Sequence, residues 1–232
     1  MSPARRFSTL PGVSVAALLE LERRRDGARP FLTWYDDASG ARVELSVATT
    51  ANWTAKIANY LQLDEDLQPG EAVTVDPVSH WTTAVVLLGV WVAGGCVQID
   101  GPATLSFVVD PMGVGLSALV GGQPDELAMP VTVSAEPALT IADRTWSHDE
   151  LAHAATHGAR THGLDAAARV LSTIGYDTVD GLDAGLLVPL TTGGSVVLVT
   201  NSDPSRESDR LTKERVTHVF RDGRLQQVRV AG

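Results

Sequence analysis

Histidines are concentrated in one short segment, where four of the six lie between His148 and His162. Asp149, His153 and His157 recur every four residues, so on a helix their side chains share one face. A carboxylate and two imidazoles are ligand types that can hold a divalent metal. The sequence offers no distant further ligand, and the pattern therefore favours a solvated helix face over a metal site. No metal and no cofactor are predicted.

Two nucleophilic side chains lack the surroundings that would activate them. Cys96 lies in an apolar stretch after Gly94-Gly95, and no base stands next to it in sequence, so we expect a small core residue. Ser195 opens a predicted strand, whereas the nucleophile of an α/β-hydrolase lies on a strand-to-helix turn. Gly113-Val114-Gly115 lacks the third glycine of a dinucleotide fingerprint. The sequence predicts no catalytic residue.

Three acids, Asp177, Asp180 and Asp183, follow a predicted strand at the edge where α/β proteins hold their ligands. Acids in such a position also cap helices and face solvent, and we expect that role for them here. The helix predicted over 205–215 interleaves both signs of charge, which indicates a solvated outer face.

The composition excludes several classes of protein. The 232 residues carry a formal net charge of −10, with a pI near 4.9, which argues against nucleic-acid binding because phosphates need a basic face. With 44% hydrophobic and 20% charged residues, the chain can bury a sizeable core. The single cysteine excludes an internal disulfide.

No membrane or secretory segment is expected. The uncharged run Pro77–Ile99 is nominally long enough to span a bilayer, but Gly94-Gly95 divides it into a helix and a short strand. Near the amino terminus, Glu20 and Glu22 interrupt the apolar stretch, which argues against a signal peptide. We expect an amphipathic first helix instead, with Ser14 as its cap and with inward-facing Val15, Leu18, Leu19 and Leu21. A cytoplasmic protein without a membrane partner is predicted.

Strands and helices alternate along the chain, which indicates an α/β fold. Helices are expected to begin near 14, 46, 80, 147, 179 and 203, and Ser147 with Glu150 has the spacing of a capping box. The segment Met112–Leu127 is glycine-rich and less regular. The predicted strands are 31–35, 42–45, 72–75, 96–99, 105–109, 138–141, 144–146, 169–174, 195–199, 216–220 and 225–230.

One internal repeat supports two similar halves. Leu87-Leu88, five residues and Gly94-Gly95 match Leu186-Leu187, five residues and Gly193-Gly194 at a constant offset. Paired glycines allow a left-handed helix cap and a close approach of helix to sheet, after which a strand returns in parallel. We therefore expect an N-terminal helical arm over 1–30, a first α/β half over 31–134 and a second over 135–232, packed as one compact domain or as two lobes of parallel or mixed sheet flanked by helices.

The segment from Val170 to Phe220 resembles the amino-terminal domain of the AMP-binding, acyl-adenylate-forming enzymes. The resemblance is carried by Val170-Leu171-Ser172-Thr173, 185–190, 193–199 and 215–220, and more weakly by Leu32-Thr33-Trp34 and the run from Pro77 to Gly95. It implies that family's fold. The chain looks like a short, degenerate relative, similar to uncharacterised truncated homologues in actinobacteria.

The departures from the family concern its nucleotide chemistry. The family's phosphate loop is rich in glycine and ends in lysine, just before a Thr-His that aligns with Ser147-His148. That alignment puts Ala135–Ala142 in the place of the loop, with Ala142 at the lysine and Glu136 where phosphates would lie. At the positions of the family's aromatic-histidine pair, this sequence has Asp177-Thr178. The later motifs and the carboxy-terminal catalytic domain have no counterpart in this sequence.

Two functions remain open from the sequence. One is a non-catalytic binding or assembly module, in which a homodimer or a protein partner covers strand edges and helix faces. Candidates for contact with such a partner are Trp53, Trp81 and Trp91, although core positions suit these residues better. The alternative is a ligand-binding protein or enzyme that keeps an acyl or nucleotide pocket between the halves. The sequence specifies neither ligand nor partner, nor the role of the segment His148–His162.

Overall fold

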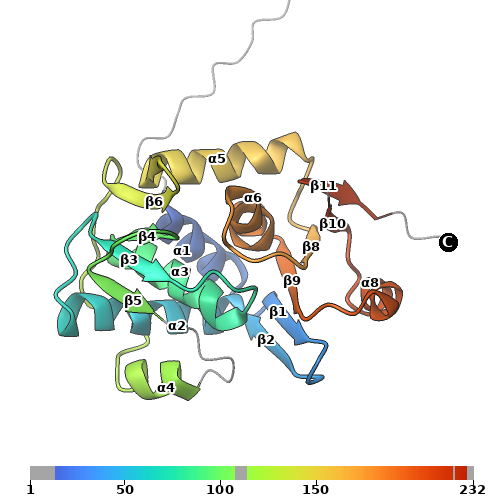
Figure 1. Cartoon of the computed structure of the whole chain (residues 1–232), viewed down its shortest axis with the longest axis horizontal. Coiled ribbons are helices and arrows are strands. Elements are labelled where there is room, and N and C mark those ends of the chain that lie inside the picture. The colour runs from blue at the N-terminus through green and yellow to red at the C-terminus, as the bar shows by residue number, and fades with distance from the viewer. Residues whose placement is uncertain (1–13, 108–113, 222, 229–232) are drawn as a thin grey trace, which may run out of the picture.

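The computed structural model describes residues 14–107, 114–221 and 223–228. In this part of the chain two sheets are flanked by helices, with sheet B on the left of Figure 1 and sheet A on the right. Sheet A has the order β11-β10-β8-β9-β1-β2, with β1 (Pro30–Asp36), β2 (Arg42–Ser46), β8 (Arg169–Ser172), β9 (Ser195–Thr200), β10 (His218–Arg221) and β11 (Arg224–Gln227). Sheet B has the order β5-β3-β4-β6-β7, with β3 (Ala72–Val75), β4 (Cys96–Gln98), β5 (Leu105–Phe107), β6 (Pro137–Ile141) and β7 (Arg144–Ser147).

Helices connect and cover these strands. They are α1 (Val15–Asp26), α2 (Val47–Asn59), α3 (Trp81–Ala93), α4 (Val114–Val120), α5 (His148–Thr161), α6 (Val179–Leu182), α7 (Val188–Thr192) and α8 (Glu207–Lys213), with π-helical turns η1 (Tyr60–Asp64) and η2 (Asp183–Leu187) and a 3₁₀ turn η3 (Pro204–Arg206). The predicted caps form: Ser14, Ser46 and Ser147 each accept a hydrogen bond from a backbone N–H of the first turn, and Ser147 with Glu150 completes a capping box.

The predicted fold class is confirmed. The central strands of each sheet run in parallel, and antiparallel hairpins such as β1–β2 and β6–β7 extend them. The boundary predicted between residues 134 and 135 does not separate the sheets, because each sheet takes strands from both halves. In parallel register β1 pairs Leu32 with Val196 of β9, and β4 pairs Val97 with Leu139 of β6. Backbone hydrogen bonding thus interlocks the two sequence halves.

The repeated Gly-Gly motif ends a buried helix in each half, as predicted. Gly94 ends α3 at φ +90° and Gly193 ends α7 at φ +74°, both in the left-handed conformation that favours glycine. The second glycine packs closely, since a Cβ at Gly194 would lie 2.6 Å from the carbonyl oxygen of Ala168. The first copy leads into sheet B and the second into sheet A.

Helix α1 packs on the body of the protein rather than extending as a separate arm. Val15 and Leu19 are buried as predicted, whereas Leu21 is 59% exposed. The position after Leu21 faces inward instead: Glu22 is buried and binds Arg29 at 2.8 Å between Oε2 and Nη2. Charge pairing therefore replaces the apolar contact that the sequence suggested.

Every residue of α3 is buried, because the helix lies between the sheets. The charge-free run identified in the sequence is thus the core of an α/β fold. Among the helices of the described residues, none combines the length and the apolar character needed to cross a bilayer.

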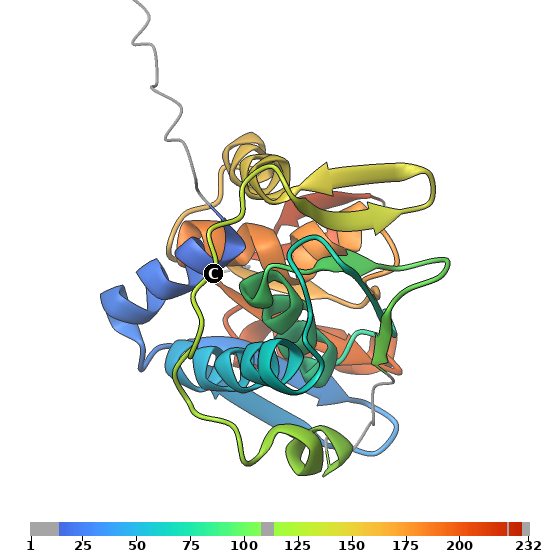
Figure 2. The same ribbon diagram turned by 90° about the vertical axis from the view of Figure 1, so that its left-hand side faces the viewer.

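Sheet B carries a row of polar side chains on the face away from α3. Its pairing places Thr74 of β3 opposite Ser106 and Gln98, Gln98 opposite Thr140, and Thr140 opposite Thr145. Figures 1 and 2 show α3 on one side of the sheet and, among the described residues, no helix over the other side. Predominantly parallel sheets are usually covered on both faces, so this open face is unusual.

The outer face of sheet A holds a network of charges around Glu214, next to the end of α8. The buried Glu214 carboxylate accepts hydrogen bonds from the Tyr35 hydroxyl and from Arg169, and Arg42 Nη2 lies 3.3 Å from its Oε1. Arg169 also donates to Thr33 Oγ1 at 2.9 Å, so the network joins β1, β2 and β8 to the segment after α8. Burial alone would raise the pKa of Glu214, but the bonds from Tyr35 and Arg169 hold that pKa below its ordinary value.

Replacing Glu214 by Gln is expected to lower the free energy of unfolding by about 3 kcal/mol at pH 7, because Arg169 loses its buried counter-charge. The native pKa is lowered, so the contribution of Glu214 is present above the ordinary glutamate pKa of 4.5 and is lost as the pH falls through the lowered pKa. Urea titrations of the wild-type protein and the variant, at pH 7 and at a pH below the lowered pKa, would measure the difference in the free energy of unfolding. Glu207→Gln, in an exposed pair with Arg221, is the control and should change stability far less; equal effects would contradict the assignment.

Candidate functional site

The hairpin β6–β7 occupies the place at which the sequence resemblance puts the phosphate loop. Only Ala142 and Asp143 connect the two strands, since Ile141 already pairs with Arg144. Ala142 has φ +51°, the left-handed conformation that a tight turn requires. The strand predicted over 138–141, within the segment that aligns with the loop, is confirmed, and β6 begins one residue earlier at Pro137.

Strand β6 has a neighbour on both sides, β4 in parallel and β7 in antiparallel. Ladder hydrogen bonds engage the backbone groups of a strand paired in this way, which leaves no cluster of free N–H groups to surround an anion. The Ser147-His148 pair that follows is structural: Ser147 caps α5, and the imidazole of His148 is fully buried near the backbone of Gly94. Burial lowers the pKa of His148.

The loop after β8, at the carboxyl end of sheet A, is closed by Tyr176. Its side chain is fully buried, its backbone N–H donates to the carbonyl of Pro77 at 2.6 Å, and its hydroxyl donates to the carbonyl of Gly185 at 3.3 Å. A Cβ at Gly185 would lie 3.0 Å from the Tyr176 ring. Thr178, at the family's histidine position, caps α6 by accepting from the N–H of Gly181 at 3.1 Å.

Further hydrogen bonds tie the two sheets together near this edge. The indole N–H of Trp34 in β1 donates to Thr200 Oγ1 at 2.8 Å and to the carbonyl of Ser79 at 3.2 Å. The Trp34 ring packs edge-on to that of His80, the N-cap of α3, with centroids 4.3 Å apart. The loop before α3 thus contacts Trp34 through the backbone carbonyl of Ser79 and the ring of His80.

The three aspartates after β8 lie in different environments. Asp177 and Asp180 are exposed, whereas Asp183 lies in η2 with its Oδ1 buried and without a hydrogen-bond partner. Burial, with a smaller contribution from Asp180, raises the pKa of Asp183 to about 6. The sequence predicted solvation for all three and missed the burial of Asp183, because the π-helical turn that rotates it inward has no recognised sequence signature.

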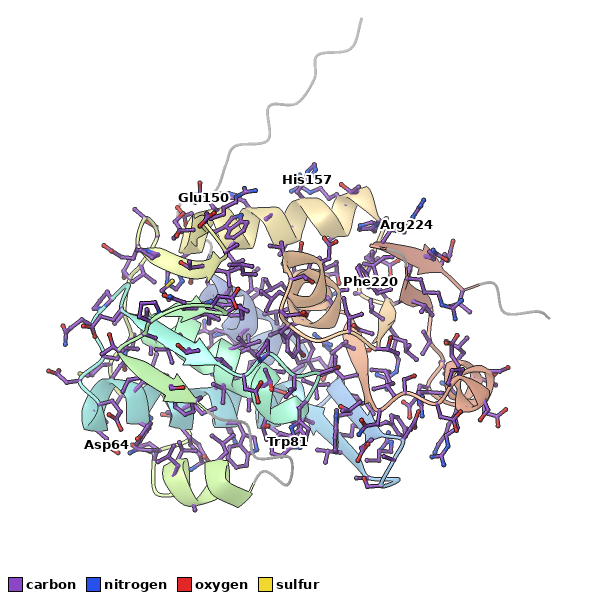
Figure 3. The ribbon with its side chains drawn as sticks, in the orientation of Figure 1. Asp64, Trp81, Glu150, His157, Phe220 and Arg224 are labelled. Atoms are coloured by element: carbon purple, nitrogen blue, oxygen red, sulfur yellow. The ribbon has the colours of Figure 1, made fainter. Side chains whose placement is uncertain are left out.

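The metal candidate on α5 does not assemble. His153 and His157 are exposed, and Figure 3 shows His157 pointing away from the protein. Asp149 is half-buried, and no group of three potential ligands within the described residues is placed to hold a metal ion. The repeat of four residues reflects an exposed helix face.

The two potential nucleophiles have structural positions. Cys96 is buried in β4, and burial raises the pKa of its thiol, which disfavours the reactive thiolate. Ser195 is the first residue of β9, and its hydroxyl accepts a hydrogen bond from Arg169 at 3.1 Å. Of Gly113-Val114-Gly115, Gly113 lies outside the described residues, and the rest begins α4.

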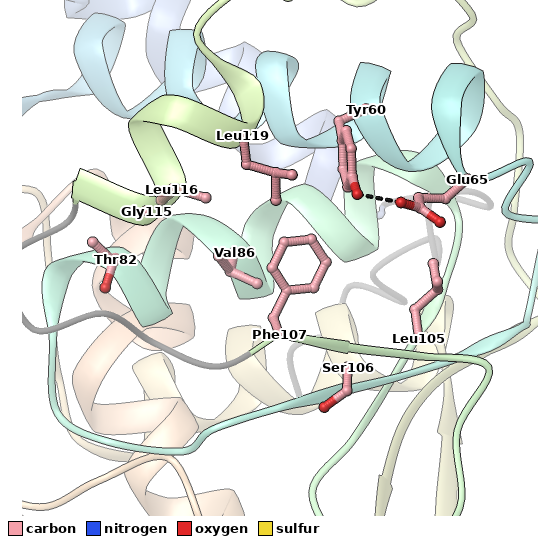
Figure 4. A pocket seen from close by; sticks show the side chains of 10 residues that line it. All are labelled: Tyr60, Glu65, Thr82, Val86, Leu105, Ser106, Phe107, Gly115, Leu116 and Leu119. Carbon is pink, nitrogen blue, oxygen red and sulfur yellow. Dashed lines mark hydrogen bonds between the residues drawn. The ribbon is translucent and has the colours of Figure 1, made fainter.

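A cavity of about 290 Å³ lies between α3, β5, α4 and the end of α2 (Figure 4). Its walls are largely apolar, and the Tyr60 hydroxyl at one end donates a hydrogen bond to the Glu65 carboxylate. The sequence reasoning missed this cavity because α4 falls in the glycine-rich segment to which no structure was assigned. The lining residues are Tyr60, Glu65, Thr82, Val86, Leu105, Ser106, Phe107, Gly115, Leu116 and Leu119.

Two other hollows are more open to solvent. A groove of about 640 Å³ runs between α1, α2 and residues 125–131, with Leu19, Ala55 and Val92 among its apolar residues and Arg23 at its side. The segment that forms its far wall is held by the buried Asn59, whose side-chain amide donates to the Glu126 carbonyl at 2.9 Å. A polar hollow of about 400 Å³ lies beside His162 and His218.

A curated protein of Mycobacterium tuberculosis, described as a TIGR03089 family protein, is 33% identical over 245 residues, which cover 91% of this chain and 100% of that protein. The chain belongs to the TIGR03089 family. No protein-family model matches its sequence.

Solved structures place this family member in the fold of adenylate-forming enzymes. The amino-terminal domain of FACL13 from M. tuberculosis matches with a TM-score of 0.71 at 13% identity, over 88% of this chain and 61% of that one. A fatty acyl-adenylate ligase from L. pneumophila, in complex with acyl adenylate and pyrophosphate, matches with a TM-score of 0.71 at 13% identity, over 93% of this chain and 45% of that one. The nonribosomal peptide synthetase FmoA3, bound to AMPPNP, matches with a TM-score of 0.71 at 18% identity, over 90% of this chain and 25% of that one.

These values confirm the resemblance that the sequence motifs indicated. The chain spans a quarter to about three fifths of the enzyme chains that it matches here. At such low identity the likeness shows the fold alone.

Replacing Asp183 by Asn is expected to raise the free energy of unfolding by about 2 kcal/mol near pH 7.5. A carboxyl whose pKa is raised by folding is most favourable below its unfolded value of 3.8, and it costs stability as the pH rises from there to about 6. The gain from D183N should therefore shrink toward pH 4. Urea unfolding at both pH values measures it, with the exposed Asp177→Asn as control; a gain that is independent of pH would refute this account.

Proposed function

We propose that this protein is a non-catalytic binding and assembly module built on the scaffold of the adenylate-forming enzymes. The observation that carries the proposal is the two-residue connection Ala142-Asp143 between β6 and β7. A loop that binds a triphosphate needs several free N–H groups, small residues that allow close approach and a cation. The turn offers at most two N–H groups outside the ladder, and neither Ala142 nor Asp143 carries a positive charge.

The few lysines of the chain support the same conclusion. The sequence contains Lys56 and Lys213 only. Lys56 on α2 is bound to Asp125 at 3.0 Å, and Lys213 on α8 lies 5.9 Å from the centre of the Tyr35 ring. Both serve local contacts far in sequence from the β6–β7 turn.

The alternative function, a pocket between the halves for an acyl group or a nucleotide, has less support. The buried ring of Tyr176 and its hydrogen bonds to Pro77 and Gly185 fill the loop at the end of β8. Gly175 adds to the tight packing, since a Cβ there would lie 2.6 Å from the Pro77 carbonyl oxygen. An occupant at this place would first have to displace Tyr176.

The open face of sheet B supports the assembly part of the proposal. Four of its strands run in parallel, and parallel sheets normally have both faces covered. The polar row that includes Thr74, Gln98 and Thr140 has no charged side chain, so a second copy can lie against this row without charge repulsion there. Trp91 and Trp81, two earlier contact candidates, are buried in the core instead.

Two measurements test for nucleotide chemistry. Calorimetry with Mg²⁺-ATP at millimolar concentration is expected to show no binding. A pyrophosphate-release assay with fatty acids and amino acids as substrates is expected to show no turnover. A competent adenylate-forming enzyme is the positive control. Glu136→Gln removes the acid next to β6 and is expected to leave both results unchanged, because the missing element is the loop itself. Magnesium-dependent ATP binding with release of pyrophosphate would overturn the proposal.

For assembly, sedimentation velocity is expected to show a dimer that dissociates on dilution. Thr140→Arg puts a bulky charge in the middle of the polar row and should yield a monomer with an unchanged melting temperature. Ser208→Arg, an exposed position on α8, adds the same charge elsewhere and should leave the dimer intact. A monomeric wild-type protein, or equal effects of the two variants, would contradict self-assembly through sheet B.

A further inference from the structure

The cavity beside α4 has the size and shape of a site for a small molecule. Its volume of about 290 Å³ lies at the lower end of the usual range for ligand pockets. Val86 of α3, Phe107 of β5 and Leu119 of α4 converge on its middle (Figure 4). Pieces of four separate elements therefore enclose one apolar space.

The cavity has one charged end. Glu65 lies there, and the Tyr60 hydroxyl donates a hydrogen bond to its Oε1 (Figure 4). That bond, together with burial and the nearby charge of Asp64, raises the pKa of Tyr60 to about 12, so the phenol stays a neutral donor at physiological pH. Of the described residues that line the cavity, none is basic. Among the described lining residues, the charge that a ligand meets is therefore the negative charge of Glu65.

Aromatic rings line the same space. The rings of Tyr60 and Phe107 lie edge to face, with centroids 6.3 Å apart and planes at 82°. Aromatic rings attract cations through their faces, and a carboxylate accepts the hydrogen bonds of an ammonium group. An anion would gain neither interaction, and it would be repelled by Glu65.

We propose that this cavity binds a small organic cation, a primary ammonium group joined to an apolar body of about one ring. The ammonium group donates to Glu65 beside the Tyr60 ring, and the apolar body packs among Val86, Phe107 and Leu119. This inference goes beyond the proposed function and does not depend on it, since the cavity shares no residue with the β6–β7 turn or with the polar row except Ser106.

Benzylamine is a suitable probe, with benzyl alcohol and benzoate as isosteric controls. Calorimetry and thermal shift on the full chain are expected to show saturable binding of benzylamine, weaker binding of the neutral alcohol and none of the acid. Equal binding of benzylamine and benzoate, or no saturable binding of benzylamine, would overturn the proposal. A protein that binds ATP would refute the proposed function and leave this result untouched.

Two matched variants locate the charge effect. Glu65→Gln is expected to weaken benzylamine about fivefold, the factor for losing a solvent-accessible ion pair. Asp64→Asn removes the same charge one residue away, outside the lining, and should have a much smaller effect. Equal losses would show a general attraction of cations to the acidic surface and would refute the site.

A third variant tests the apolar part of the site. Leu119 lines the cavity but is 44% exposed, so Leu119→Trp can fill the cavity without disturbing the core. It should abolish binding of benzylamine while the circular dichroism spectrum stays unchanged. Full binding by a folded L119W protein would place the probe elsewhere and refute the proposal.

Discussion

The backbone pairing of β6 constrains what this protein can do. A central strand has its N–H and carbonyl groups engaged by neighbours on both sides, and β6 pairs with β7 from Pro137 to Ile141 and with β4 at Leu139 and Thr140. The chain then turns into β7 within two residues, Ala142 and Asp143. An anion cradle needs backbone amides that point away from any ladder, and in this hairpin only the two turn residues lie outside the ladder. The fold of the adenylate-forming enzymes is thus kept, with a tight hairpin in the segment that the sequence resemblance aligns with the phosphate loop.

Parallel pairing between the two halves of the chain holds this scaffold together. Leu32 of β1 pairs with Val196 of β9, and Val97 of β4 pairs with Leu139 of β6, so each sheet depends on strands from both halves of the chain. The buried α3 packs between the sheets and provides much of the core. Neither half can bury its apolar strands without the other, which makes the fold cooperative.

The outer faces of the two sheets carry different kinds of polar side chain. Over sheet A, Glu214 and Arg169 neutralise each other beneath partial cover from α8. Sheet B presents uncharged hydroxyl and amide groups such as those of Thr140 and Gln98, which are compatible with water and with a second protein surface. The cavity beside α4 is distinct from both, because its described lining joins apolar walls to one carboxylate, that of Glu65. Ion-paired, uncharged polar and apolar surfaces thus lie on different parts of one scaffold.

Local patterns in the sequence determined the elements of this protein. Serine caps, the two Gly-Gly motifs and alternation of apolar runs specify where helices end and strands begin, because these depend on hydrogen bonds and backbone angles of nearby residues. The family resemblance, and the departure of residues 135–142 from that family's phosphate-loop pattern, were also visible in the sequence. Tertiary structure alone decided that the two halves exchange strands, that Tyr176 fills the loop after β8, that Asp183 turns inward and that a cavity opens beside Glu65. Each of these results from contacts between residues distant in the chain, and the free energy of such contacts leaves no periodic trace in the sequence.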